Sequence, residues 1–158
     1  MTMVEIFTAR FPEHVDVVRA IFREYADGLA IDLSFQNFEG ELSGLPGKFT
    51  APQGRVLLAQ IDAEIVGCVA MQPLEGTICE MKRLYVRPSA RGQQVGWKLA
   101  SLICQVAKEA GYSRIRLDTV PGMEAAQEIY ASLGFKAIPA YVFNPVDGVI
   151  YLERDLGG

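Results

Sequence analysis

Two residues and one loop in this sequence could take part in chemistry. Glu80 is an acid inside an otherwise apolar segment, and a buried charge is costly unless it has a partner or a task. It could act as a general base, or it could pair with Lys82 or Arg83 at a sheet edge. Tyr130 could donate a proton as a phenol of pKa about 10, or it could be an amphipathic core residue near a helix end.

The loop is Arg91-Gly92-Gln93-Gln94-Val95-Gly96, which leads into the first turn of a long predicted helix. No Ser, Thr, Asp or Asn is placed to cap that turn, so its backbone N–H groups are left for a ligand. These amides, the helix dipole and the Arg91 guanidinium suit a pyrophosphate, and the two glycines would let the backbone approach it. An ordinary solvated helix start is the alternative. The loop matches neither a Walker motif nor a dinucleotide fingerprint.

The strands that must position these residues follow from apolar runs. Three consecutive strands with short connections predict an antiparallel meander. The strand, helix and strand of residues 80–119 then predict a right-handed parallel crossover. The predicted strands are residues 4–9, 56–61, 65–71, 77–86 and 115–119, with closing strands at 141–143 and 148–152 around a turn at 144–147.

Four helices are predicted between these strands. The first opens at Pro12-Glu13 and ends at Gly28, and the second runs from a Ser34 cap to about Leu42. The third and longest follows Pro88 and stops at Gly111, and the fourth covers residues 123–133 with Gly134 after it. The expected fold is therefore a mixed α/β sheet of six or seven strands with about four helices.

Composition narrows the classes of function. The 158 residues and 17.4 kDa fit one domain covering 1–158, and half of the residues are hydrophobic. A net charge of −4 and a pI near 5.0 argue against nucleic-acid partners. No apolar run reaches the roughly 18 residues of a membrane span, and the N-terminus lacks a leader pattern. We expect a soluble, cytoplasmic protein without membrane partners.

Cysteine and histidine are too few and too scattered for several kinds of site. Cys68, Cys79 and Cys104 are odd in number and share no close spacing, so neither a disulfide framework nor a zinc site is expected. Buried free thiols and no metal are the prediction. His14 is the single histidine, and a Ser/His/Asp triad could be built only around it.

Two segments together resemble the motifs of the GCN5-related N-acetyltransferases (GNAT). The family's main motif is a strand, then Arg/Gln-x-x-Gly-x-Gly/Ala, then a long helix, and residues 81–88 followed by 91–96 are similar to it. The second motif is a helix ending in Tyr-x-x-Leu-Gly-Phe, which residues 130–135 match. The resemblance covers about residues 55–136. It departs at Gln94, where the family has a glycine, so this side chain must turn away if a pyrophosphate binds there.

The resemblance implies acetyl-CoA as co-substrate and a GNAT-like sheet whose central parallel strands splay. By the same resemblance Glu80 is the general base, Tyr130 protonates the departing sulfur, and the strand amide of Leu84 stabilises the oxyanion. Leu84 and Val86 would present backbone groups to the pantetheine arm, and Thr119 and Ala126 would line its other side. The cofactor-binding residues implied are Leu84, Val86, Arg91, Gly92, Gln93, Gln94, Val95, Gly96, Thr119 and Ala126.

The leading hypothesis is an N-acetyltransferase that moves acetyl to a primary amine by direct attack, since no Cys is positioned for a covalent intermediate. The amine could belong to a small molecule or a peptide, and a homodimer is left open. The alternatives are a non-catalytic acyl-CoA-binding regulatory module and a nucleotide-binding module. The acceptor pocket is expected between residues 28–50 and 138–147, with Tyr25, Phe35, Tyr141 and Asn144 as candidates.

Overall fold

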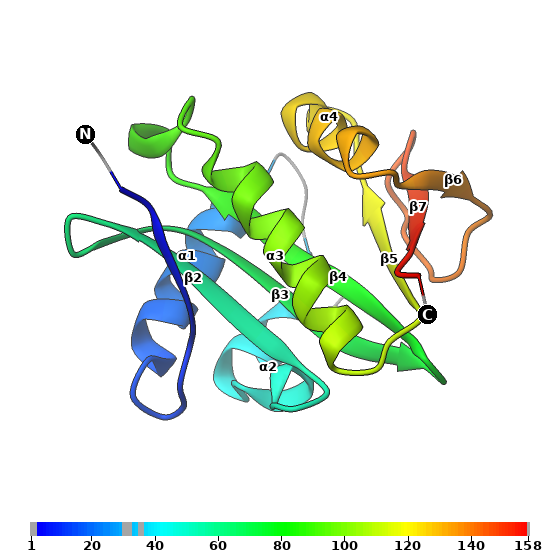
Figure 1. Ribbon diagram of the computed structural model, residues 1–158. Coiled ribbons are helices and arrows are strands. Elements are labelled where there is room, and N and C mark those ends of the chain that lie inside the picture. Colours follow the sequence, from blue (N-terminus) through cyan, green and yellow to red (C-terminus); the bar gives the residue numbers. More distant parts are fainter. Residues whose placement is uncertain (1–2, 30–32, 35–36, 158) are drawn as a thin grey trace.

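The computed structural model describes residues 3–29, 33–34 and 37–157. Within these residues seven strands form one mixed sheet in the order β1-β2-β3-β4-β5-β7-β6, and four α-helices cover its faces (Figure 1). The predicted mixed α/β class is confirmed. The strands are β1 Glu5–Thr8, β2 Arg55–Ile61, β3 Glu64–Glu75, β4 Ile78–Val86, β5 Arg114–Thr119, β6 Lys136–Ile138 and β7 Ile150–Asp155. The helices are α1 Val15–Asp27, α2 Phe38–Ser43, α3 Val95–Glu109 and α4 Glu124–Ser132, with 3-10 turns at Gly47–Phe49 and Pro88–Ala90.

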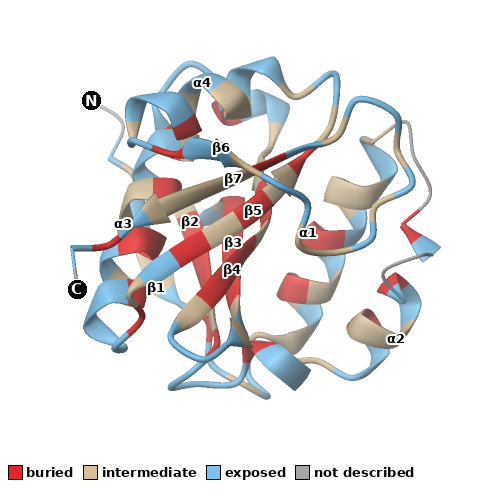
Figure 2. Ribbon diagram, turned by 90° about the vertical axis from the view of Figure 1, so that its right-hand side faces the viewer, coloured by how far each residue is buried: buried red, intermediate tan, exposed pale blue. Residues whose placement is uncertain are grey.

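The sheet separates two hydrophobic cores. Side chains alternate between the faces of a strand, so Leu57 packs into the core under α3 while its neighbour Leu58 packs into the core under α1 and α2. Figure 2 shows these buried residues concentrated along the central strands and on the inner sides of the helices. The face that carries α1 and α2, where the sequence predicts the acceptor pocket, is called the acceptor face below, and the face that carries α3 is called the α3 face.

Strand β4 contains a β-bulge that changes which residues face each side. Cys68 of β3 lies opposite Tyr85 and Ala70 lies opposite Lys82, so Arg83 and Leu84 together oppose one residue of β3. Arg83 has a φ of 62°, in the left-handed region, and such an extra residue locally disrupts the ladder. Because of the bulge, Lys82 and Arg83 both face α2, while Leu84 returns to the α3 core.

The parallel pairing of β4 with β5 is short. Only three register pairs join them, from Ile78 with Arg114 to Glu80 with Arg116. Beyond Glu80 the two strands diverge, and β5 keeps its full-length antiparallel partner β7 on the other side. A gap therefore opens between the central strands of the sheet.

Three sequence-based expectations are corrected. Residues 141–143 are not a strand: β7 instead pairs with β6, three residues that follow the turn at Gly134. Helix α1 begins at Val15, because residues 11–14 form a turn in which Arg10 donates its N–H to His14 Nδ1 at 2.8 Å. Helix α2 begins at Phe38, after Asn37 in the left-handed conformation, and Ser34 does not cap it.

Candidate active site

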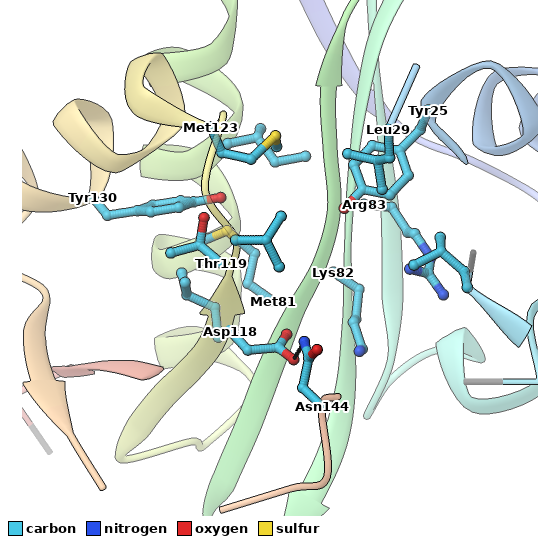
Figure 3. Close-up of a pocket in the computed structure, with 14 residues that line it drawn as sticks. Tyr25, Leu29, Met81, Lys82, Arg83, Asp118, Thr119, Met123, Tyr130 and Asn144 are labelled. Atoms are coloured by element: carbon cyan, nitrogen blue, oxygen red, sulfur yellow. Dashed lines mark hydrogen bonds between the residues drawn. The ribbon is translucent and has the colours of Figure 1, made fainter. Parts of the chain in front are cut away.

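A narrow cavity of about 50 Å³ lies where β4 and β5 diverge. Figure 3 shows Tyr130 and Thr119 on one side of it and Arg83, Tyr25 and Leu29 on the other. Tyr25, Leu29, Leu33, Met81, Lys82, Arg83, Leu84, Leu117, Asp118, Thr119, Val120, Met123, Tyr130 and Asn144 line it. We refer to it as the acyl cavity.

Tyr130 reaches the acyl cavity from α4. Gly134 has a φ of 88°, which ends the helix and brings the Phe135 N–H back to the Tyr130 carbonyl at 3.0 Å. The two rings pack 5.6 Å apart between centroids. The tyrosine is only 6% exposed, and its hydroxyl has no hydrogen-bond partner among the described residues. Burial, with Tyr25 and Asp118 nearby, raises the pKa of Tyr130 above its ordinary value, so the phenol is protonated at neutral pH.

The other strand and helix residues implied by the resemblance divide between cavity and core. Leu84, directly after the bulge, and Thr119, at the end of β5, are buried and line the acyl cavity. Val86 ends β4, and its carbonyl accepts a hydrogen bond from Arg91 Nε at 3.2 Å. Ala126 is half-buried and packs against the α3 core, so it lies outside the lining of the cavity.

The loop of residues 91–96 lacks a side-chain cap, as predicted. Gln94 precedes α3 with a φ of 61°, the left-handed conformation that glycine adopts easily, and its exposed side chain makes no capping hydrogen bond. Gly92 has a φ of 87° with open space around its Cα, and Gln93 is exposed. The first amides of α3 are consequently open to a ligand.

Gly96 was expected to let the backbone approach a bound pyrophosphate, but it has a packing role instead. It lies inside α3, where an added Cβ would meet Ile129 Cδ1 at 3.0 Å and Val86 Cγ2 at 3.5 Å. Its neighbour Val95, the first residue of α3, is buried in the same core. The small residue at Gly96 therefore allows α3 to approach α4 and β4 closely.

Glu80 lies on the acceptor face and is only 2% exposed. Its Oε1 accepts from Gln72 Nε2 at 2.9 Å and lies 3.7 Å from Lys82 Nζ, and its Oε2 accepts from the Tyr141 hydroxyl at 2.7 Å. Burial, followed by the charge of Glu80, raises the pKa of Tyr141, and Arg116 lies 5.4 Å from the centre of that ring. The carboxylate is both a paired group and a group placed in a cleft.

A larger cavity of about 570 Å³ adjoins Glu80 on the acceptor face, and we call it the acceptor cleft. Both ranges predicted for the acceptor pocket contribute to it. Asn37, Gly40, Glu41, Gly44, Pro46, Gly47, Lys48 and Phe49 come from the first range, Val142 and Phe143 from the second, and Gln72, Pro73, Leu74, Glu80, Lys82 and Asp118 from β3, β4 and β5.

The four acceptor candidates named from sequence have different positions. Tyr25 and Asn144 line the acyl cavity, and Tyr141 holds Glu80. Phe35 lies outside the described residues. Sequence reasoning missed Asp118, which lines both cavities. An acid between buried Leu117 and Thr119 at the end of a strand was the available signal.

A buried ion pair fixes α2 over the bulge of β4. Arg83 donates from Nε and Nη2 to the two carboxylate oxygens of Glu41, at 3.0 and 2.8 Å, and its side chain is 2% exposed. Its guanidinium also lies 5.1 Å from the ring centre of Phe38 and 5.8 Å from that of Tyr25. Burial acts to lower the pKa of Arg83, but the hydrogen bonds and charge of Glu41 outweigh it and raise the pKa.

The three cysteines are free and buried, as predicted. Cys68 donates from Sγ to the Arg83 carbonyl at 3.2 Å, and burial raises the pKa of Cys79 to about 12. Across the described residues no cluster of three or more His, Cys, Asp or Glu side chains could hold a metal ion. The same part of the chain has no helix long and apolar enough to cross a membrane.

Comparisons with known proteins agree with this geometry. The model of the acetyltransferase (GNAT) family matches residues 13–135. An uncharacterized N-acetyltransferase of Schizosaccharomyces pombe is 36% identical over 97% of this chain and 95% of its own length. A GNAT-family acetyltransferase structure from Staphylococcus aureus superposes with a TM-score of 0.78 at 20% identity, covering 98% of this chain and 99% of that one. An acetyltransferase of Salmonella typhimurium, solved with its cofactor acetyl-CoA, gives 0.71 at 17% identity, covering 97% and 94%.

Proposed function

This chain belongs to the GNAT family of acetyltransferases, and we propose that it transfers acetyl from acetyl-CoA directly to a primary amine. The observation that carries the proposal is the divergence of β4 and β5 after three register pairs, with Tyr130 and Leu84 lining the gap. An acceptor cleft that meets this gap from the opposite face of the sheet supports the same function.

The residues present fit acetyl-CoA. The uncapped amides at the start of α3, reached through residues 91–94, suit its pyrophosphate. The Arg91 guanidinium now bonded to the Val86 carbonyl is exposed and adds a positive charge at this place. Beyond the bulge, the backbone of Leu84 and Val86 suits the amide groups of a pantetheine arm. Acetyl-CoA would supply the activated acyl group at the acyl cavity.

The chain's own groups suit each proton step. Glu80 would accept a proton from the acceptor ammonium, through water because both of its oxygens already accept hydrogen bonds. The amide of Leu84 would donate to the thioester oxygen as negative charge develops on it. The new C–N bond forms as the C–S bond breaks, and Tyr130 donates its proton to the departing sulfur. The products are an N-acetyl amine, free CoA thiol and one proton released to solvent.

Gln94 was the feature that favoured a regulatory, non-catalytic module. Its backbone has the conformation that the family's glycine would adopt, and its side chain is exposed. This supports cofactor binding, and the buried Tyr130 hydroxyl supports turnover in addition to binding.

Thermal shift and thiol release test the proposal together. We expect acetyl-CoA and CoA, but not ATP, to raise the melting temperature, and we expect free thiol to appear when a suitable amine is added. Stabilisation by CoA without thiol release across a broad panel of amines would favour the regulatory module. No stabilisation by either CoA species would contradict both functions.

A further inference from the structure

The acyl cavity and the acceptor cleft meet at two charged residues. Lys82 of β4 and Asp118 of β5 are the side chains common to the linings of both cavities within the described chain. Figure 3 shows the Asp118 carboxylate beside the Asn144 amide, with the Lys82 ammonium on the other side of Asn144. An amine that enters from the acceptor cleft and attacks a thioester in the acyl cavity must pass between these two charges.

Asp118 is the acid in this region whose charge is not balanced by a cation of the described residues. Glu41 is bonded by Arg83, and Glu80 is bonded by Gln72 and Tyr141 and faces Lys82. Asp118 accepts one hydrogen bond, on Oδ2 from Asn144 Nδ2 at 2.9 Å.

Asn144 is itself fixed, because its Oδ1 accepts the N–H of Val146 at 3.0 Å. Within the described residues the second oxygen of Asp118 has no hydrogen-bond partner, and an ammonium is the group that would complete this carboxylate.

Lys82 places a positive charge across the gap from Asp118. Its side chain is 13% exposed, and its Nζ lies 3.7 Å from Glu80 Oε1, beyond the range of a good hydrogen bond. A lysine ammonium has three N–H donors, so a ligand carboxylate at this opening can share the Lys82 charge with Glu80. Opposite charges on the two sides of one opening match a ligand that carries both signs close together.

The rest of the acceptor cleft has a mixed lining, with six apolar side chains beside three glycines and five polar or charged residues. Phe49, Pro46, Pro73, Leu74, Val142 and Phe143 line it. Lys48, also in its lining, is exposed. A volume of about 570 Å³ leaves space for a sizeable apolar group attached to the charged end of a ligand.

We propose that the acceptor is an α-amino acid with an apolar side chain, whose ammonium binds Asp118 and whose carboxylate binds Lys82. This recognition rests on the proposed acetyl transfer at the same site. Asp118 holds the nitrogen that attacks, at the junction where it meets the acyl group, and Lys82 holds the carboxylate on the opposite side of this junction. The apolar side chain fills the cleft toward Phe49 and Val142.

Acceptor binding can be measured without turnover, by calorimetry on the CoA complex. The probes are phenylalanine, phenylalaninamide, which lacks the carboxylate charge, and phenethylamine, which lacks the carboxyl group. We expect phenylalanine to bind at least tenfold more tightly than either analogue, because each analogue lacks the carboxylate that makes a charge-assisted contact with Lys82. Equal affinities, or no binding of phenylalanine, would overturn the proposal, and this comparison needs no variant.

Two lysine variants then assign the contact. In Lys82→Met the preference for phenylalanine over phenylalaninamide should disappear, whereas Lys48→Met, a matched change in the lining of the same cleft, should keep it. Loss of the preference in Lys48→Met instead would contradict the assignment. Asp118→Asn should weaken all three probes by about tenfold or more, and unchanged affinities would exclude Asp118 as the ammonium site. Unchanged CoA binding and melting temperature verify that each variant is folded.

Thiol release on the same probes separates this proposal from the one it rests on. Equal kcat/KM for phenylalanine and phenylalaninamide would reject the recognition and keep the acetyl transfer. The expected binding preferences with no thiol release from any probe would keep the recognition and reject the transfer.

Discussion

The two sides of the candidate site use different chemical groups: one offers mainly backbone groups, and the other offers side chains. On the side proposed for the cofactor, residues 91–96 and the end of β4 offer backbone groups, set by the positive φ of Gly92 and Gln94 and by the bulge at Arg83. On the acceptor side, side chains bond one another: Glu41 with Arg83, and Asn144 with Asp118. The cofactor side depends on conformation, and the acceptor side depends on pairs of charged and polar groups.

This difference explains why only one side has a recognisable motif. A backbone site needs a few residues at fixed local spacing, as in the loop before α3. Side-chain pairs join distant positions: 42 residues separate Arg83 from Glu41, 61 separate Tyr141 from Glu80, and 26 separate Asn144 from Asp118. The same difference predicts that truncating side chains should affect stability and ligand binding more on the acceptor side than in the loop at 91–96.

The largest effect on stability is expected from Glu41→Ala, which leaves the Arg83 guanidinium buried without its partner. The free energy of unfolding should fall by about 3–5 kcal/mol. Glu39→Ala is the matched control, because Glu39 forms an exposed pair with Arg23 at 3.1 Å and its loss should change the free energy of unfolding little. Urea denaturation measures both, and equal losses would mean that α2 is not held by this pair.

Tyr130→Phe tests the single side chain on the cofactor side to which we assign chemistry. We expect kcat to fall by about 10²–10³-fold while the affinity for acetyl-CoA stays nearly constant, because only the proton donor is lost. In the control Tyr112→Phe, a hydroxyl bonded to the Gln53 carbonyl at 2.7 Å is removed outside both cavities, and kcat should not change. A full kcat in Tyr130→Phe would show that another group protonates the sulfur.

A smaller effect is expected from Gln94→Gly. A glutamine in the left-handed conformation is strained by about 1–2 kcal/mol, and glycine relieves this at some cost in the entropy of the unfolded chain. The unfolding free energy should rise by about 0.5 kcal/mol, with less than about a threefold change in the Kd for acetyl-CoA. Gln93→Gly, at the neighbouring position without a positive φ, should instead lose stability. A large gain in acetyl-CoA affinity would mean that the Gln94 side chain obstructs the loop.

No effect is expected from thiol reagents on the folded protein. Burial raises the pKa of Cys79 to about 12 and also raises those of Cys68 and Cys104. At pH 8 only about one Cys79 thiol in 10⁴ is then ionised. Iodoacetamide should modify the cysteines in denaturant but leave native thiols and acetyl transfer unchanged. Rapid inactivation by the reagent would point to a covalent acyl-enzyme and against direct attack.

Local patterns predicted most of the fold. The meander of β2 to β4, the crossover through α3 and the helix stops at Gly111 and Gly134 are all as expected, because alternation and glycine signals act over a few residues. The strand predicted at 141–143 was wrong. The strand that pairs with β7 in its place, β6, has only three residues, which is too few to show an alternating pattern in the sequence. The segment after it is held by side chains such as Tyr141.

The backbone features of the candidate site could be predicted from sequence, but the arrangement of its charged side chains could not. The loop at 91–96 and Tyr130 lie in local motifs, and the predicted acceptor ranges do line the cleft. Asp118 could have been noticed as an acid at a strand end, but its position opposite Lys82 depends on where β4 and β5 separate. Lys82 itself was expected only as a partner for Glu80. The bulge at Arg83 places two successive cations, Lys82 and Arg83, on one face of the sheet. It could not be predicted, because strand prediction assumes that successive side chains alternate between the faces.

Because β4 and β5 pair over only three residues, a ligand bound between them would add to the stability of the fold. With three register pairs between them, the unit of β5, β6, β7 and α4 is joined to the remaining sheet by few backbone bonds. Packing in the core under α3 and side-chain contacts such as Tyr141 with Glu80 hold it in addition. A molecule bound in the gap would contact both units, and its binding free energy would be added to the free energy of unfolding, by about 2.7 kcal/mol at a hundredfold excess over Kd. The concentration of substrate would therefore set how firmly the C-terminal strands are attached.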